Sequence, residues 1–144
     1  MSFSLPPIVK AAERLLLEIE QAVRRFPRYH KYTHGTRLRE QAMAIARLTH
    51  RAWRDQPHRA MWTTKLIWAI DDLKISLQLG KQIEAFVSFA QFEMLARLCA
   101  DLGKQCGGWR KQQHRDSQNV VGKQSQPQRA EILSSRTASQ GANP

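Results

Sequence analysis

Lysine and arginine side chains supply most of the chemistry that this sequence offers. The chain has 144 residues, of which 23 are Lys or Arg and 12 are Asp or Glu, so its formal net charge is +11. Such a surplus of cations favours a polyanionic partner, most often nucleic acid, because Lys and Arg neutralise phosphates and release counterions. A site built from clustered acids is not expected in a chain with so few carboxylates.

Many of the cations recur at spacings that place them on shared sides of helices. Arg47, Arg51 and Arg54 lie three, four and seven residues apart, and His50 falls on the same side. Two further pairs repeat at intervals of seven residues: Lys74 with Lys81, and Lys104 with Lys111. Helical cations spaced in this way predict basic stripes on the outside of the protein.

The densest basic run spans residues 24–39, where rings alternate with cations. Rings beside cations can stack on exposed bases while the cations hold phosphates. The alternative is that these runs are solvated helix faces and that the aromatic residues belong to the core. The rings of the run are Phe26, Tyr29, His30, Tyr32 and His34. From all these groups we predict an interface for RNA, and also for DNA, made of Arg24, Arg25, Arg28, Lys31, Arg37, Arg39, Arg47, Arg51, Arg54, Lys74, Lys81, Lys104, Arg110 and Lys111.

Histidines and carboxylates give weaker signals for a metal site or an active site. His30 and His34 have the i,i+4 spacing of two zinc ligands on a helix, but Lys31 stands between them and no Cys or carboxylate is close in the sequence. Asp71 and Asp72 lie within a helical pattern and are expected to face solvent. We therefore predict no metal, no cofactor and no catalytic residues, and the protein is not expected to be an enzyme.

The two cysteines, Cys99 and Cys106, are interpreted as small apolar residues of the core. Seven residues of helix rise about 10 Å, which is too far for a disulfide. Free thiols favour a reducing compartment, so we expect a cytoplasmic protein. No apolar run approaches the roughly 18 residues of a membrane span, and the first residues lack the basic and apolar regions of a secretory signal. No association with a membrane is expected.

Apolar residues at spacings of three and four predict four helices. The first helix begins at Pro6-Pro7 and ends near Pro27. The other three cover about residues 36–55, 59–83, and 88 to about 111. Proline suits the first turn of the first helix and stops it at its end. The inner faces, in chain order, are Ile8, Ala12, Leu15, Ile19, Val23 and Phe26; Leu38, Ala42, Ile45, Ala46, Thr49, Ala52 and Trp53; Trp62, Leu66, Ile70, Leu73 and Leu77; Phe92, Leu95, Ala96, Cys99, Leu102, Cys106 and Trp109.

Polar residues at the expected helix starts support these boundaries. Thr33 or Thr36 is the expected N-cap of the second helix. Ser88 suits the N-cap of the fourth helix, and Gln91 stands at its third helical position, as in a capping box.

Four helices of this length with short links predict an all-α fold, an up-down-up-down four-helix bundle over residues 1–111. Gly80 and Gly103 sit inside helical patterns and are expected to let helices approach closely. Residues 112–144 are rich in Gln and Ser and hold few large apolar side chains, so we interpret them as a disordered basic tail.

Two strings in the sequence are similar to a known family. One is FPRYHKYT at residues 26–33, followed by Gly35, Arg37 and Leu38, and the other is LGKQCGGWRK at 102–111. Between them stand LQLGK, starting at Leu77, and VSF, starting at Val87. In this order they resemble the four-helix-bundle family that contains the accessory variability determinant (Avd) of diversity-generating retroelements. The same family contains the proteins encoded by intervening sequences in 23S ribosomal RNA genes, and the resemblance covers about residues 8–111.

The resemblance implies a non-catalytic partner of the retroelement reverse transcriptase. In that system the enzyme copies a template RNA with errors at adenines, and the accessory protein binds the enzyme and nucleic acid through its basic surface. The alternative within the family is a stand-alone RNA-binding bundle of the ribosomal intervening-sequence type. A toxin-like helical nuclease is a third reading, and the lack of an acid or histidine cluster in the sequence speaks against it.

The family resemblance also implies a ring-like homopentamer. The residues themselves point to a subunit interface, because a lone bundle of about 100 residues does not need four tryptophans inside it. We therefore expect some of the four to lie between subunits rather than in the core: Trp53, Trp62, Trp68 and Trp109.

Overall fold

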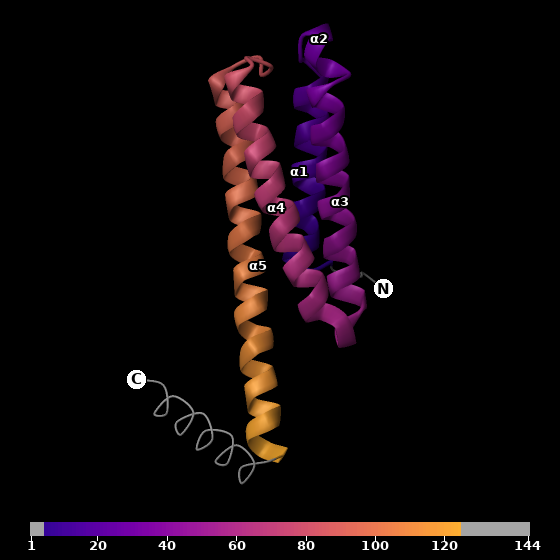
Figure 1. Cartoon of the computed structure of the whole chain (residues 1–144), viewed down its shortest axis with the longest axis vertical. Coiled ribbons are helices and arrows are strands. Elements are labelled where there is room, and N and C mark those ends of the chain that lie inside the picture. Colours follow the sequence, from indigo (N-terminus) through magenta and orange to yellow (C-terminus); the bar gives the residue numbers. More distant parts are fainter. Residues whose placement is uncertain (1–4, 125–144) are drawn as a thin grey trace, which may run out of the picture. The chain divides into compact units, whose positions relative to one another are not determined.

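The structure, a computed structural model, describes residues 5–124, and the side chains of residues 5–116. This part of the chain is all-helical and contains no strand, which confirms the predicted class. Successive long helices run in opposite directions (Figure 1). The elements are α1 (Pro7–Arg24), α2 (Arg28–Lys31), α3 (His34–Arg54), the 3₁₀ turn η1 (Gln56–His58), α4 (Arg59–Gln82) and α5 (Phe89–Gln124).

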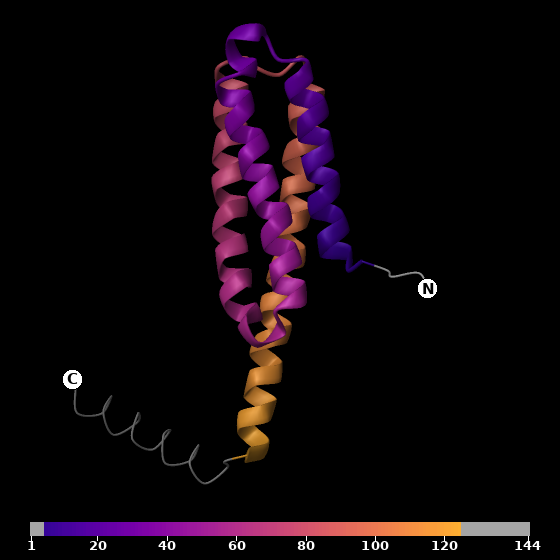
Figure 2. The same cartoon turned by 90° about the vertical axis from the view of Figure 1, so that its right-hand side faces the viewer.

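The chain divides into two compact units, and the bundle is the first of them. The division falls between Trp109 and Arg110, within α5. In the first unit α1, α3, α4 and the beginning of α5 pack together, and the α1–α3 link and the α4–α5 link lie at the same end (Figure 2). The described part of the second unit is helical up to Gln124.

The interior of the bundle is built from the four predicted apolar stripes. Leu15, Ile45, Leu66 and Leu95, one from each long helix, are fully buried in a single cluster. Burial of each such side chain contributes about 1.5–3 kcal/mol. The predicted inner faces are confirmed, with some members half-buried rather than fully buried: Trp53, Trp62, Ala96 and Trp109.

The segment between the first two long helices is more regular than a linker. We expected the second helix to begin near Thr36, whereas α3 begins at His34 and the short helix α2 precedes it. Of the two predicted caps, Thr33 occupies the N-cap position and Thr36 lies within the helix, but no side chain makes a capping hydrogen bond to α3. The Thr33 hydroxyl instead donates a hydrogen bond to the Tyr29 carbonyl at 3.0 Å.

A buried histidine explains why α3 begins where it does. His34 is buried, and its Nε2–H donates to the carbonyl of Ser76 on α4 at 2.7 Å. Its neighbour Gly35 lies so close to α1 that a Cβ atom would stand 2.7 Å from Cγ1 of Val23. These contacts with α1 and α4 stabilise the first turn of α3 without a side-chain capping bond.

The start of α5 has the predicted Ser88 cap, but the Gln91 side chain bonds the residue before Ser88 rather than Ser88 itself, so the capping box is only half formed. The backbone N–H of Gln91 donates to Oγ of Ser88 at 3.1 Å, and the Gln91 side chain accepts from the N–H of Val87 at 3.4 Å. The preceding link leaves α4 through Glu84, whose φ of 59° is in the left-handed region. Such a residue turns the chain out of a helix.

The last helix is longer than the sequence pattern predicts. We expected it to end near residue 111, but α5 continues to Gln124. Residues 112–124, which we had assigned to a disordered tail, therefore have helical backbone. The remainder of that predicted tail, residues 125–144, lies outside the described residues.

Candidate nucleic-acid interface

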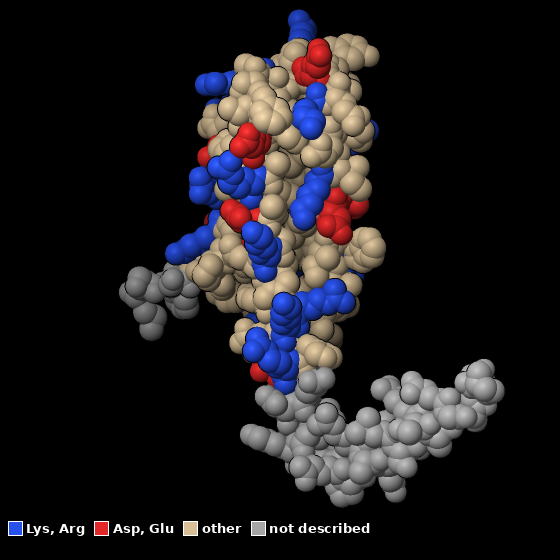
Figure 3. Space-filling model, turned by 90° about the vertical axis from the view of Figure 1, so that its left-hand side faces the viewer, with Lys and Arg blue, Asp and Glu red and all other residues tan. Residues whose placement is uncertain are grey.

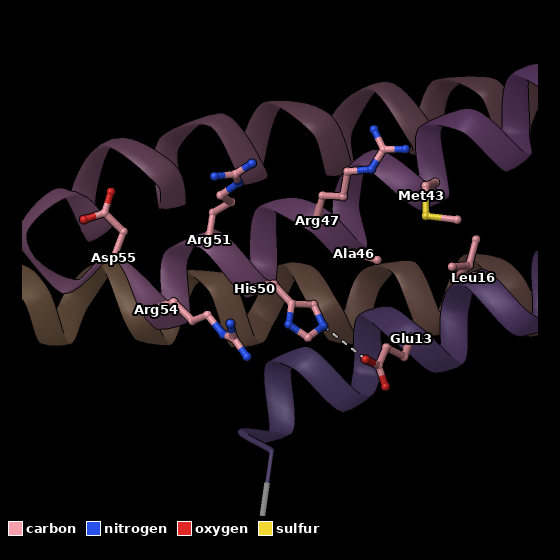
Figure 4. A pocket seen from close by; sticks show the side chains of 9 residues that line it. All are labelled: Glu13, Leu16, Met43, Ala46, Arg47, His50, Arg51, Arg54 and Asp55. Atoms are coloured by element: carbon pink, nitrogen blue, oxygen red, sulfur yellow. Dashed lines mark hydrogen bonds and ion pairs between the residues drawn. The ribbon is translucent and has the colours of Figure 1, made fainter.

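The outer face of α3 forms one wall of a groove whose other wall is α1. The inner face of α3, which includes Leu38 and Ile45, is buried in the core, so the helical period turns Arg47 and Arg51 outward. The groove has a volume of about 830 Å³. It is lined by Glu13, Leu16, Met43, Ala46, Arg47, His50, Arg51, Arg54 and Asp55 (Figure 4).

The three arginines of the groove do not all point the same way. Arg47 and Arg51 extend to one side of α3, whereas His50 and Arg54 extend toward α1 (Figure 4). The carbon Cζ of Arg51 lies 5.9 Å from the centre of the Trp62 ring, and that of Arg54 lies 5.6 Å from the Trp53 ring. A guanidinium that rests on a ring keeps its N–H groups free for a phosphate.

The carboxylates of the groove are occupied by other partners. Oε1 of Glu13 lies 3.1 Å from Nε2 of His50, and Asp55 accepts hydrogen bonds from Trp62 at 2.9 Å and from His58 at 3.0 Å. The bond from Trp62 and then the bond from His58 hold the pKa of Asp55 below its usual value. Among the described residues, Arg47, Arg51 and Arg54 form no ion pair. Their charges are therefore available to an anionic ligand.

A smaller depression extends the groove toward the start of α3. It has a volume of about 540 Å³ and shares Met43 and Arg47 with the larger groove. Arg39 also lines it, and the Nε–H of Arg39 donates to Glu20 on α1 at 2.7 Å. Of the predicted binding residues, Arg39 is thus engaged within the protein.

The predicted cations of residues 24–37 lie at one end of the bundle. Arg24, Arg25, Arg28 and Arg37 are exposed and Lys31 is half-buried. They stand around α2 and the start of α3, whereas Arg54 is the last residue of α3. Because α3 has 21 residues, the two ends of this helix are about 30 Å apart.

The predicted lysines of α4 and α5 do not join the groove. The side chain of Lys74 lies beside Gly103 of α5: a Cβ atom added to this glycine would stand 3.4 Å from Nζ of Lys74. Nζ of Lys81 lies 4.9 Å from the centre of the Phe92 ring, which also belongs to α5. Lys104 is exposed. On the face that includes α5, basic and acidic side chains are mixed over the upper part (Figure 3).

The last two residues of the predicted nucleic-acid interface, Arg110 and Lys111, belong to the second unit. Both are exposed on α5.

Sequence reasoning missed the groove as such. It placed Arg47, Arg51 and Arg54 on one side of a helix, but nothing in the local pattern pairs that side with α1. Glu13 and Leu16 could not be assigned to the site, since they lie more than 25 residues away in the chain. The hydrogen bond between Glu13 and His50 was missed for the same reason.

The histidines and cysteines do not form a metal site in the part of the chain that the structure describes, where no group of three or more potential ligands gathers. Nε2 of His34 is hydrogen-bonded to the Ser76 carbonyl. His30 lies on the separate short helix α2, so the two histidines do not share one helix. Burial raises the pKa of the Cys99 thiol to about 11 and that of Cys106 to about 12, so both are uncharged at neutral pH. The prediction that both cysteines are buried is confirmed.

Comparisons with known proteins identify no relative of this chain. No family profile matches the chain, and a search of curated proteins finds no similar sequence. No helix within residues 5–124 is long and apolar enough to cross a membrane.

Proposed function

We propose that this protein is a nucleic-acid-binding accessory subunit and that the groove between α1 and α3 holds the phosphate backbone. The observation that carries the proposal is the set of three exposed arginines, Arg47, Arg51 and Arg54, none of which is paired with a carboxylate among the described residues. On a chain with a net charge of +11, such a row gives affinity that depends on charge rather than on base sequence.

The partner in this proposal is the reverse transcriptase of a diversity-generating retroelement. It is supported by the family resemblance of residues 26–33 and 102–111. The protein has the cations to hold template RNA and cDNA, and the enzyme supplies the carboxylates and metal ions of polymerisation. Its contribution to mutagenic retrohoming is to hold the enzyme and the template together, which raises the local concentration of each.

Self-association is the second part of the proposal, in the form of a ring-like homopentamer. It is supported by an exposed apolar stripe on α4, whose other side is buried in the core. Trp68 is 66% exposed, and the spacings of seven and four residues place its apolar neighbours on the same side of the helix. Exposed large apolar side chains that recur along one side of a helix are typical of a surface that another subunit covers, and the exposed Lys65 and Asp72 stand among them. The stripe consists of Met61, Trp68, Ile75, Leu79 and Ile83.

A triple substitution of the groove arginines tests the proposal. R47A/R51A/R54A should weaken binding of RNA and DNA and reduce the salt dependence, with the slope of log K against log salt falling by about 2 for single strands. The matched control is R14A/K65A/R97A, which removes the same charge from exposed sites outside the groove. It should change the slope by less than half as much.

Two further measurements decide between the enzyme partner and the alternative. Co-purification with a reverse transcriptase encoded next to this gene, together with a template and variable repeat pair, supports the retroelement function. A protein that binds RNA through the groove but has no such neighbouring gene would instead be a stand-alone RNA-binding bundle of the ribosomal intervening-sequence type. Equal salt slopes for the groove triple and the wild type would place the binding surface elsewhere.

A further inference from the structure

The end of the bundle that carries α2 presents two aromatic rings to solvent. Tyr29 on α2 is 81% exposed, and Tyr32 directly after this helix is 69% exposed. The two residues are three positions apart, with Tyr29 inside α2 and Tyr32 at its C-cap. Figures 1 and 2 place α2 at the extreme end of the bundle.

The backbone under these rings is held firmly by the bundle. Phe26, which precedes α2, is buried and makes an edge-to-face contact with Phe86 of the α4–α5 link at 5.1 Å between ring centres. The Thr33 hydroxyl donates to the carbonyl of Tyr29. A ring on a fixed turn loses little conformational entropy when a ligand stacks on it.

The charged residues that flank the two rings in the sequence are all cations. Residues 21–39 contain six Lys and Arg residues and no carboxylate. Arg24, Arg25 and Arg28 are exposed there, and Nζ of Lys31 lies 6.0 Å from the centre of the Tyr32 ring. Exposed rings among cations match a ligand that has both flat π faces and negative charges, which is the chemistry of unpaired nucleotides.

We propose that Tyr29 and Tyr32 stack on unpaired bases while Arg24, Arg25 and Arg28 hold the neighbouring phosphates, so that this end of the bundle binds single-stranded RNA or DNA. Bases within a duplex already stack on one another, so a duplex does not use the rings. The inference rests on the proposed function for nucleic acid as the partner, and it adds a second site and a preference for single strands.

The test uses the full chain and a single strand of about 12 nucleotides with a central 2-aminopurine, made as RNA and as DNA and also annealed to its complement. The Y29A/Y32A variant should bind both single strands at least about 25-fold more weakly, since each of the two stacked bases contributes about 5-fold or more. Quenching of the 2-aminopurine fluorescence should be lost. The variant should bind the duplex within about 2-fold of the wild type and keep its salt slope, because no charge has changed.

Two matched variants separate stacking from folding. Y29F/Y32F keeps both rings and should bind like the wild type, whereas Y29L/Y32L keeps apolar bulk without a flat π face and should lose affinity like the alanine variant. Wild-type affinity of Y29A/Y32A for the single strands would overturn the inference. If R47A/R51A/R54A then still lost affinity, the proposed function would stand without this site, and if both variants bound normally, both proposals would fall.

Discussion

Arginine residues take three different roles in this chain, according to what lies beside each side chain. Arg39 is paired with Glu20 across two helices, and the arginines of the groove, such as Arg47, have no ion pair among the described residues. Arg59 closes the end of α3: its Nε–H and Nη2–H donate to the carbonyls of Ala52 at 2.7 Å and Trp53 at 2.9 Å. Unsatisfied carbonyls at a helix C-terminus favour such a cation.

Removal of Arg59 should destabilise the bundle. R59A should lower the free energy of unfolding by about 2 kcal/mol, because two charge-assisted hydrogen bonds are lost. The stacking of Arg59 on Trp109, with 5.2 Å from Cζ to the ring centre, is lost as well. Denaturant unfolding followed by circular dichroism measures the change.

The matched control is R97A, which breaks only the exposed pair with Glu93 one turn away on α5. Such a pair contributes about 0.3–0.5 kcal/mol. If R59A and R97A were equally stable, the role of Arg59 at the end of α3 would be disproved.

At the scale of the helices, the two interior glycines differ in what they contact. A Cβ on Gly80 would stand 2.8 Å from the Phe86 ring and 3.2 Å from Nε2 of His34, so the predicted close approach is confirmed there. On Gly103 the nearest atom would be the flexible Nζ of Lys74 at 3.4 Å, an ordinary contact. The expected tight packing at Gly103 is therefore not present.

Alanine substitutions at these two glycines should change the stability of the protein in opposite directions. G103A should stabilise the protein by about 0.5–1 kcal/mol, since alanine is the better helix former. G80A should destabilise it by about 1 kcal/mol, because overpacking against Phe86 and His34 outweighs the same gain. Thermal unfolding of the two variants beside the wild type measures both shifts. Destabilisation by G103A would contradict the contact geometry at that site.

At the scale of the whole molecule, α4 has an apolar side in the core and another in solvent. The proposed oligomer predicts that W68E/I75E disperses the assembly into monomers, because a charge cannot be buried unpaired in an apolar interface. Light scattering at micromolar concentration should give near five times the mass of one chain for the wild type. The control is Q78E, an exposed position off the stripe, which should keep the wild-type mass. A monomeric wild type would disprove the oligomer.

Deletion of residues 115–144 should leave the thermal midpoint of the bundle nearly unchanged. Among residues 5–116, whose side chains the structure describes, every member of the buried core cluster and every residue packed against it lies at or before Trp109. The deletion also removes cations, Arg115 among them, so nucleic-acid affinity should fall while stability does not. A loss of about 10 °C or more on scanning calorimetry would show that this region stabilises the bundle.

The local pattern of the sequence determined the class of fold and the inner face of each helix. Apolar residues recur with the period of a helix, so Leu15, Ile45 and Leu66 had to turn inward once the helices formed. The same period placed Arg47, Arg51 and Arg54 together on the outside. These features follow from the chain within two or three turns, where geometry depends on spacing alone.

Only the tertiary structure decided which helix faces which. It brought Glu13 of α1 to His50 and opened the groove between them, and it joined His34 to Ser76, which moved the start of α3. It also left Trp68 exposed while the other three tryptophans became half-buried. A helical period fixes the side of a helix that is buried, but the neighbour that covers it is chosen by the packing of side chains from distant parts of the chain.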